Sequence, residues 1–224
     1  MKKNIGFLLL FTLFLELNAR WPFNLFGAKK PFSIVLEASG DAINPGRTIF
    51  NNFENSICFT LAQQIKQILD ANYIPARIYL NRTPTEIITP LQNAQFSNKL
   101  AADLYISIHC YQCNHPQARI HLYQFSYHDP IIIKKNSLGF YRADQIYLLN
   151  ETQTTQWIHE FKKIISGQSE IEIHGVYALP FKPLLGIEAS AFGIEIGIPH
   201  NANMNQIAYI ISSALEEFIR RKNA

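Results

Sequence analysis

Charge is scarce in this sequence, and so is repetition. Only 17% of the 224 residues are Asp, Glu, Lys or Arg, and the formal net charge is +3. So mild a balance argues against a nucleic-acid-binding tract and against an acidic tail. We find no low-complexity block and no internal repeat. With 48% hydrophobic residues, the chain has enough apolar material for one well-packed domain.

Cysteine is also rare, with only Cys58, Cys110 and Cys113 in the chain. We expect Cys110, Cys113 and His115 to lie in a loop that follows a strand ending at His109. In an oxidising compartment the first two can form a local disulfide and leave Cys58 unpaired, or they can remain loop thiols. A zinc knot made from these neighbours is the alternative. Zinc sites usually draw ligand pairs from separate segments, which favours the disulfide or the thiols.

Long apolar runs are absent except near the N-terminus. Lys2 and Lys3 precede an apolar run at residues 5–15, and Ala19 is a small residue at a cleavable position. A charged start, a short apolar run and a small-residue exit are typical of a secretory signal peptide, here residues 1–20. The alternative is an uncleaved anchor that contacts the membrane through residues 5–15. Both predict export to the periplasm or the outside, and no cysteine follows the run to carry a lipid.

From residue 32 onward, segments typical of strands alternate with segments typical of helices. This order predicts a single α/β domain over residues 32–224, preceded by a lead-in linker at 21–31. We expect a mostly parallel sheet of about six strands, flanked by helices, in a monomeric protein. Residues 128–150 carry no strong period and are expected to be irregular. The expected strands are 32–36, 76–80, 104–109, 118–125 and 191–197, with short extended pieces at 175–177 and 184–185; the expected helices are 52–72, 85–101, 152–166 and 203–221.

Three polar residues are expected to converge at one edge of this sheet. Glu54 opens the helix after the first strand, His109 ends a strand with one purely apolar face, and Glu195 interrupts a buried strand. Open α/β sheets build their sites at the carboxyl ends of strands. Glu54 is also explained by the helix dipole, and His109 by a structural role. Glu195 is harder to explain in this way, because a buried carboxylate needs a partner, a metal or a raised pKa.

The order of these pieces resembles the zinc-dependent N-acetylmuramoyl-L-alanine amidases, which cut peptidoglycan between the lactyl group of the sugar and the stem peptide. The likeness covers roughly residues 32–222. Ile34-Val35-Leu36 matches the first strand of the family, and Glu37-Ala38-Ser39-Gly40-Asp41 matches the family's Asp-Pro-Gly-His-Gly loop after it. The other matching stretches are Glu54, Leu80-Asn81-Arg82, Ser97-Asn98, Ala102-Asp103, Ser107-Ile108-His109, and Ile194-Glu195-Ile196-Gly197-Ile198 followed by His200-Asn201.

The resemblance implies a cell-wall hydrolase that acts on peptidoglycan by metal-activated water. It implies zinc held by Glu54 and His109, with Glu195 as the catalytic residue that moves the proton. Arg82 and Asn98 correspond to family positions with a substrate-contacting or structural role.

The chain departs from the family pattern at the first zinc ligand. The family histidine aligns with Gly40, which has no side chain, and the shaping Pro and Gly beside it are Ala38 and Ser39. Catalytic zinc normally takes three protein ligands and a water. Asp41 is a candidate third ligand if the loop shifts by one residue, and Cys113 and His115 are weaker substitutes.

Two functions therefore remain open from the sequence. The first is an exported zinc amidase with an altered ligand set. The second is a catalytically inactive amidase-fold protein that binds peptidoglycan or regulates a wall enzyme. A general metallopeptidase or deacetylase fits the carboxylates and the histidine, but it does not fit the order of the motifs.

Overall fold

A computed structural model describes residues 30–127, 141–168 and 170–223. The predicted signal peptide or anchor and nearly all of the lead-in lie outside the described residues, as do residues 128–140 of the irregular segment. From residue 31 onward the described chain forms one compact unit. No helix in the described ranges is both long and apolar enough to cross a membrane.

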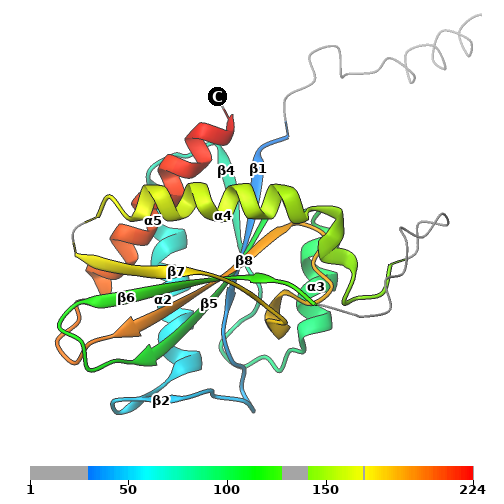
Figure 1. Ribbon diagram of the computed structural model, residues 1–224. Coiled ribbons are helices and arrows are strands. Elements are labelled where there is room, and N and C mark those ends of the chain that lie inside the picture. Colours follow the sequence, from blue (N-terminus) through cyan, green and yellow to red (C-terminus); the bar gives the residue numbers. More distant parts are fainter. Residues whose placement is uncertain (1–29, 128–140, 169, 224) are drawn as a thin grey trace, which may run out of the picture. The chain divides into compact units, whose positions relative to one another are not determined.

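A six-stranded sheet forms the centre of this unit (Figure 1). Its spatial order is β4-β1-β5-β8-β6-β7, and all neighbours are parallel except β6 and β8, which are antiparallel. The expected mostly parallel α/β fold is confirmed. The strands are β1 Phe32–Ala38, β4 Ala76–Leu80, β5 Leu104–Gln112, β6 Ala118–Phe125, β7 Ile171–Leu179 and β8 Ser190–Ile198.

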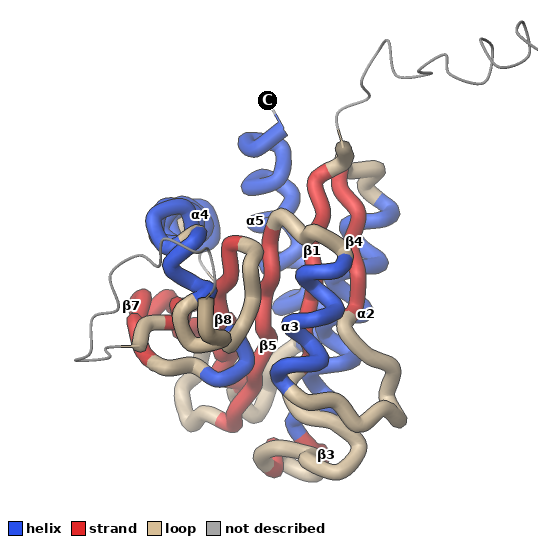
Figure 2. The backbone as a smooth tube through the Cα atoms, turned by 90° about the vertical axis from the view of Figure 1, so that its right-hand side faces the viewer, coloured by secondary structure: helices blue, strands red, loops and turns tan. Residues whose placement is uncertain are grey.

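Helices cover the two faces of the sheet unequally, as can be followed in Figures 1 and 2. The larger core joins one face to α2 Glu54–Ala71, α4 Glu151–Ile165 and α5 Met204–Asn223. A smaller core on the other face packs against α3 Pro90–Lys99 and the 3-10 turn η2 Lys182–Leu184. The β6 side chains Arg119, His121 and Tyr123, which alternate with buried Ile120 and Leu122, are only partly buried. The remaining short elements are β2 Thr48–Ile49, β3 Asn52–Phe53 and η1 Ile146–Leu149.

Four expectations about elements are wrong. The extended piece expected at 184–185 is instead the end of the 3-10 turn η2, Lys182–Leu184. β7 is a full nine-residue strand rather than a short extended piece at 175–177. The helix expected over 85–101 spans Pro90–Lys99, because Thr89 caps it through a reciprocal pair of hydrogen bonds with Gln92. β5 continues past His109 to Gln112, because its ladder with β8 extends that far. Cys110 therefore lies in the strand and not in a loop.

The three cysteines are free thiols in the structure. Cys110 and Cys58 are both fully buried in the larger core, whereas Cys113 is half-buried. Burial raises the pKa of the Cys58 thiol, and contact with Cys110 raises it further. Of the two alternatives for Cys110 and Cys113, a local disulfide or two thiols, the structure contains the thiols.

This burial predicts that one thiol of three reacts quickly with a disulfide reagent in the native protein, because the thiolate is the nucleophile and buried thiols are inert. Each cysteine that reacts releases one thiolate from the reagent, so measuring the released thiolate before and after denaturation checks the prediction. Cys113→Ser should abolish the fast phase. Fast labelling of two or three thiols in the folded protein would contradict it.

Candidate functional site

The fold brings Glu54, His109 and Glu195 to one end of β5 and β8. His109 and Glu195 are direct neighbours in the β5–β8 ladder. Glu54 begins α2, and its Oε1 lies 3.3 Å from His109 Nδ1. The predicted convergence of these three residues is therefore present in the geometry.

Glu54 is held by backbone donors as well as by His109. Its side chain is 4% exposed, and its two oxygens accept the N–H groups of Arg47 at 3.1 Å and Cys110 at 3.3 Å. Gly46 lies directly against this carboxylate with φ +76°, and a Cβ there would stand 2.7 Å from Glu54 Oε2. Only glycine allows the loop to approach so closely.

Burial by itself would raise the pKa of the Glu54 carboxyl. Hydrogen bonds from His109, Arg47 and Cys110 overcome it and lower that pKa from an ordinary 4.5 to about 2. The ionised form is therefore favoured in the folded protein. The corresponding stability is fully present above pH 4.5 and is lost as the pH falls from 4.5 towards 2.

We therefore expect acid to destabilise the wild-type protein more than Glu54→Gln. Between pH 6 and pH 2 the wild type should lose up to about 3 kcal/mol more unfolding free energy than the variant. Urea denaturation at several pH values measures both. An equal loss of unfolding free energy in the wild type and in Glu54→Gln would contradict the lowered pKa of the Glu54 carboxyl.

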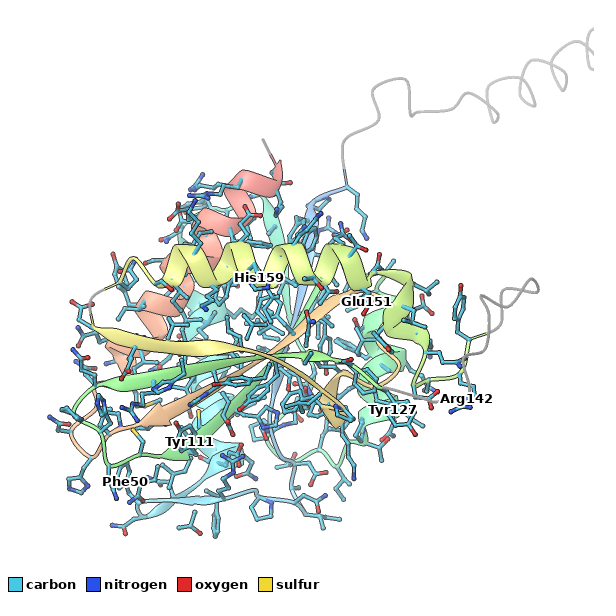
Figure 3. The ribbon with its side chains drawn as sticks, viewed as in Figure 1. Phe50, Tyr111, Tyr127, Arg142, Glu151 and His159 are labelled. Atoms are coloured by element: carbon cyan, nitrogen blue, oxygen red, sulfur yellow. The ribbon has the colours of Figure 1, made fainter. Side chains whose placement is uncertain are left out.

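Glu195 has a hydrogen-bond donor on each oxygen. Tyr123 of β6 donates its hydroxyl to Oε2 at 2.7 Å, and Arg47 Nη2 lies 2.7 Å from Oε1. The Glu195 side chain is 16% exposed, so it is reachable from solvent. Burial and the neighbouring Glu195 raise the pKa of Tyr123, which keeps its hydroxyl protonated as a donor. The Arg47 guanidinium also lies 5.9 Å from the ring centre of Tyr111, which is labelled in Figure 3.

His109 is fixed on both of its ring nitrogens. Nδ1 faces Glu54, and Nε2 lies 3.0 Å from the Ser107 hydroxyl. The ring of Phe181 meets the imidazole edge-on at 5.0 Å. Glu37 lies next to Ser107, and burial raises the pKa of the Glu37 carboxyl, which favours the neutral acid.

Arg47, Tyr123 and Glu37 were not among the predicted site residues. Tyr123 follows Arg119 and His121 on the polar side of an alternating strand, so the period places it on the correct face. Nothing in the sequence around Arg47 indicates that its side chain turns back onto two glutamates.

Asp41 does not join Glu54 and His109. Its Oδ1 accepts the N–H groups of Ile43 at 2.8 Å and Asn44 at 2.6 Å, and Asn44 Nδ2 lies 3.1 Å from both oxygens. These donors bind the carboxylate to its own loop. Gly40 beside it has φ +74°, and a Cβ there would stand 2.7 Å from Asn55 Cβ. This loop conformation therefore has no room for a side chain at position 40.

Arg82 and Asn98 have structural contacts in this arrangement. Arg82 is buried and donates to the backbone oxygens of Ala38 and Ser39. Asn98 binds Gly186 O and the Glu188 N–H, beside a pocket of about 280 Å³ at the amino ends of β5 and β8. Asn98 is therefore at the end of the sheet remote from Glu195.

The donor set does not fit a three-ligand zinc site. Among the residues that the structure describes, no three His, Cys, Asp or Glu side chains form a group able to hold a metal ion. Glu54 and His109 supply two donor atoms, whereas catalytic zinc takes three from the protein. The positive charge beside these residues belongs to Arg47.

Several solved structures with the same fold are N-acetylmuramoyl-L-alanine amidases. The catalytic domain of CwlV, an N-acetylmuramoyl-L-alanine amidase from Bacillus (Paenibacillus) polymyxa var. colistinus, superposes with a TM-score of 0.61 at 14% identity, covering 84% of this chain and 98% of that one. AmiC2 of Nostoc punctiforme gives 0.58 at 14% identity, with 85% and 98% covered. Ami1 from Mycobacterium smegmatis gives 0.56 at 11% identity, with 85% and 97% covered. A comparison with curated protein sequences gives no match.

The family assignment comes from the sequence itself. Residues 34–210 match the model of the N-acetylmuramoyl-L-alanine amidase family. This range includes Glu54, His109 and Glu195. The chain therefore belongs to the N-acetylmuramoyl-L-alanine amidase family of cell-wall hydrolases.

Proposed function

We propose that this protein hydrolyses the amide between N-acetylmuramic acid and L-alanine in peptidoglycan, with Glu195 as the catalytic carboxylate. Family membership supports the bond and the substrate. The observation that carries the residue assignment is the position of Glu195, which is solvent-accessible and is paired directly with His109 in the β5–β8 ladder.

The residues of this site can take different roles in amide hydrolysis. Glu195 takes a proton from the attacking water and returns it to the leaving amine. The guanidinium of Arg47 and the hydroxyl of Tyr123 are the donors beside it that can face a developing oxyanion. We assign no step to zinc, although zinc is the cofactor that the family resemblance implies, because the described donors do not complete its ligand set.

We propose in addition that the protein is exported through residues 1–20 and acts as a monomer in the periplasm or outside the cell. The substrate supports this location, since peptidoglycan lies outside the cytoplasmic membrane. The mild net charge of +3 is compatible with contact with the wall polymer.

A second candidate function is peptidoglycan binding without cleavage. The specific observation in its favour is that both oxygens of Glu195 are engaged, by Arg47 and by Tyr123. The missing side chain at Gly40 points in the same direction.

Purified protein incubated with sacculi separates the two functions. Hydrolysis of the proposed bond releases free stem peptides that begin with L-alanine, which mass spectrometry identifies. We expect release by the wild type. Sedimentation of the protein with sacculi, without any released peptide, would refute the hydrolase proposal and favour the binding function.

A further inference from the structure

Arg47 occupies a position between the two acidic residues of the site. Its Nη2 lies 2.7 Å from Glu195 Oε1, and its Nε lies 3.9 Å from Glu54 Oε2. Its backbone N–H donates to the same Glu54 oxygen at 3.1 Å. One residue thus contacts both carboxylates, one of them through two separate groups.

The loop that carries Arg47 is fixed to the start of α2. The N–H of Glu54 donates to Arg47 O at 2.8 Å, and the N–H of Asn55 donates to Pro45 O at 3.0 Å. These are two of the donors that a helix leaves unpaired at its first turn. Gly46 allows the close approach to Glu54. The backbone of Arg47 is therefore positioned by the same turn that positions Glu54.

A guanidinium at this position opposes a divalent cation. A metal bound by Glu54 Oε1 and His109 Nδ1 would share the Glu54 carboxylate with Arg47 and would stand near a fixed positive charge. The arginine also remains charged at any pH at which the protein is folded. Its side chain is 52% exposed, so its removal would leave room for solvent and ions.

We infer that Arg47 is the resident cation of this site: its guanidinium balances the charge of Glu54 and Glu195 and keeps divalent metal away from Glu54 and His109. This inference concerns metal binding and does not rest on the proposed amide hydrolysis. The Arg47 guanidinium thus supplies the positive charge that zinc would supply according to the family resemblance.

Zinc titration by calorimetry tests this inference on the full chain. We expect Arg47→Met to bind one zinc ion at least ten times more tightly than the wild type. Arg119→Met is the matched control, because Arg119 forms an ion pair with Glu172 outside the site. The control should bind zinc as the wild type does. Adding His109→Ala to Arg47→Met should remove the gain, which locates the new ion.

Equal zinc affinity in the wild type and Arg47→Met would overturn the inference, and so would a gain that survives His109→Ala. Circular dichroism establishes that each variant is folded. If Arg47→Met does not fold, Arg47→Gln takes its place, and Arg47→Lys, which keeps the charge, should stay within threefold of the wild-type affinity. Tight zinc binding by Arg47→Lys would also count against it. Loss of the proposed amidase activity would leave these isotherms unchanged.

Discussion

Replacing Glu195 by Gln is expected to lower the rate of stem-peptide release from sacculi by a factor of about 10² to 10⁴, the usual contribution of a positioned proton-transfer group. Glutamine has nearly the same shape, so it keeps an oxygen for the Tyr123 hydroxyl, which donates to Glu195 at 2.7 Å. It cannot take a proton from water. The fold should be preserved, and the loss should appear in kcat.

Glu172→Gln is the matched control for this substitution. Glu172 also forms an ion pair with an arginine, Arg119, at the edge of the sheet. Within the part of the chain that the structure describes, the ion-pair partners of Glu172 are Arg119, His115 and His174, and not His109 or Arg47. Removing its charge should change the rate less than threefold. Retention of more than a tenth of wild-type activity by Glu195→Gln would exclude Glu195 as the proton-transfer residue.

The sheet could be predicted from the sequence wherever its strands carry a strong pattern. β4 and β6 lie within the predicted bounds, since each has a clear apolar or alternating run. The sequence predicts only a short piece of β7, because β7 is an edge strand with few buried side chains and contains Gly175. Its pairing with β6, including the register shift near His121, is a tertiary contact that no local pattern indicates.

The site could be predicted only where a residue has a signature of its own. Glu195 stands out because it interrupts an apolar strand, whereas Glu54 and His109 become candidates only through the order of the motifs around them. The sequence suggests Asp41 as a ligand only because it is next to Gly40, but hydrogen bonds from the N–H groups of Ile43 and Asn44 fix the direction of its side chain. Arg47 acquires its role from a loop that folds back onto α2, which depends on contacts formed only in three dimensions.

Arg82→Met is expected to lower the free energy of unfolding by about 3 kcal/mol or more. Arg82 is 5% exposed and donates to Ala38 O at 3.2 Å, and to Ser39 O and Asn55 O at 3.1 Å each. Methionine fills a similar volume but leaves these three carbonyl oxygens without their donor. Each buried group that loses its partner costs about 1 kcal/mol or more. Urea denaturation at neutral pH measures the change.

The three carbonyl oxygens that Arg82 binds lie at the ends of two different elements, so replacing Arg82 should weaken the contact between these elements. Ala38 and Ser39 lie at the end of β1, and Asn55 lies in the first turn of α2 beside Glu54, so Arg82 joins the elements that carry the site. Arg82→Lys keeps a charge but has no planar fork of donors, and we expect it to restore only part of the stability. Arg77→Met, on the exposed side of β4, is the control and should cost less than about 0.5 kcal/mol. If Arg82→Met stays within about 1 kcal/mol of the wild type, the end of β1 and the start of α2 must be held by other contacts. The geometry of Glu54 would then owe little to Arg82.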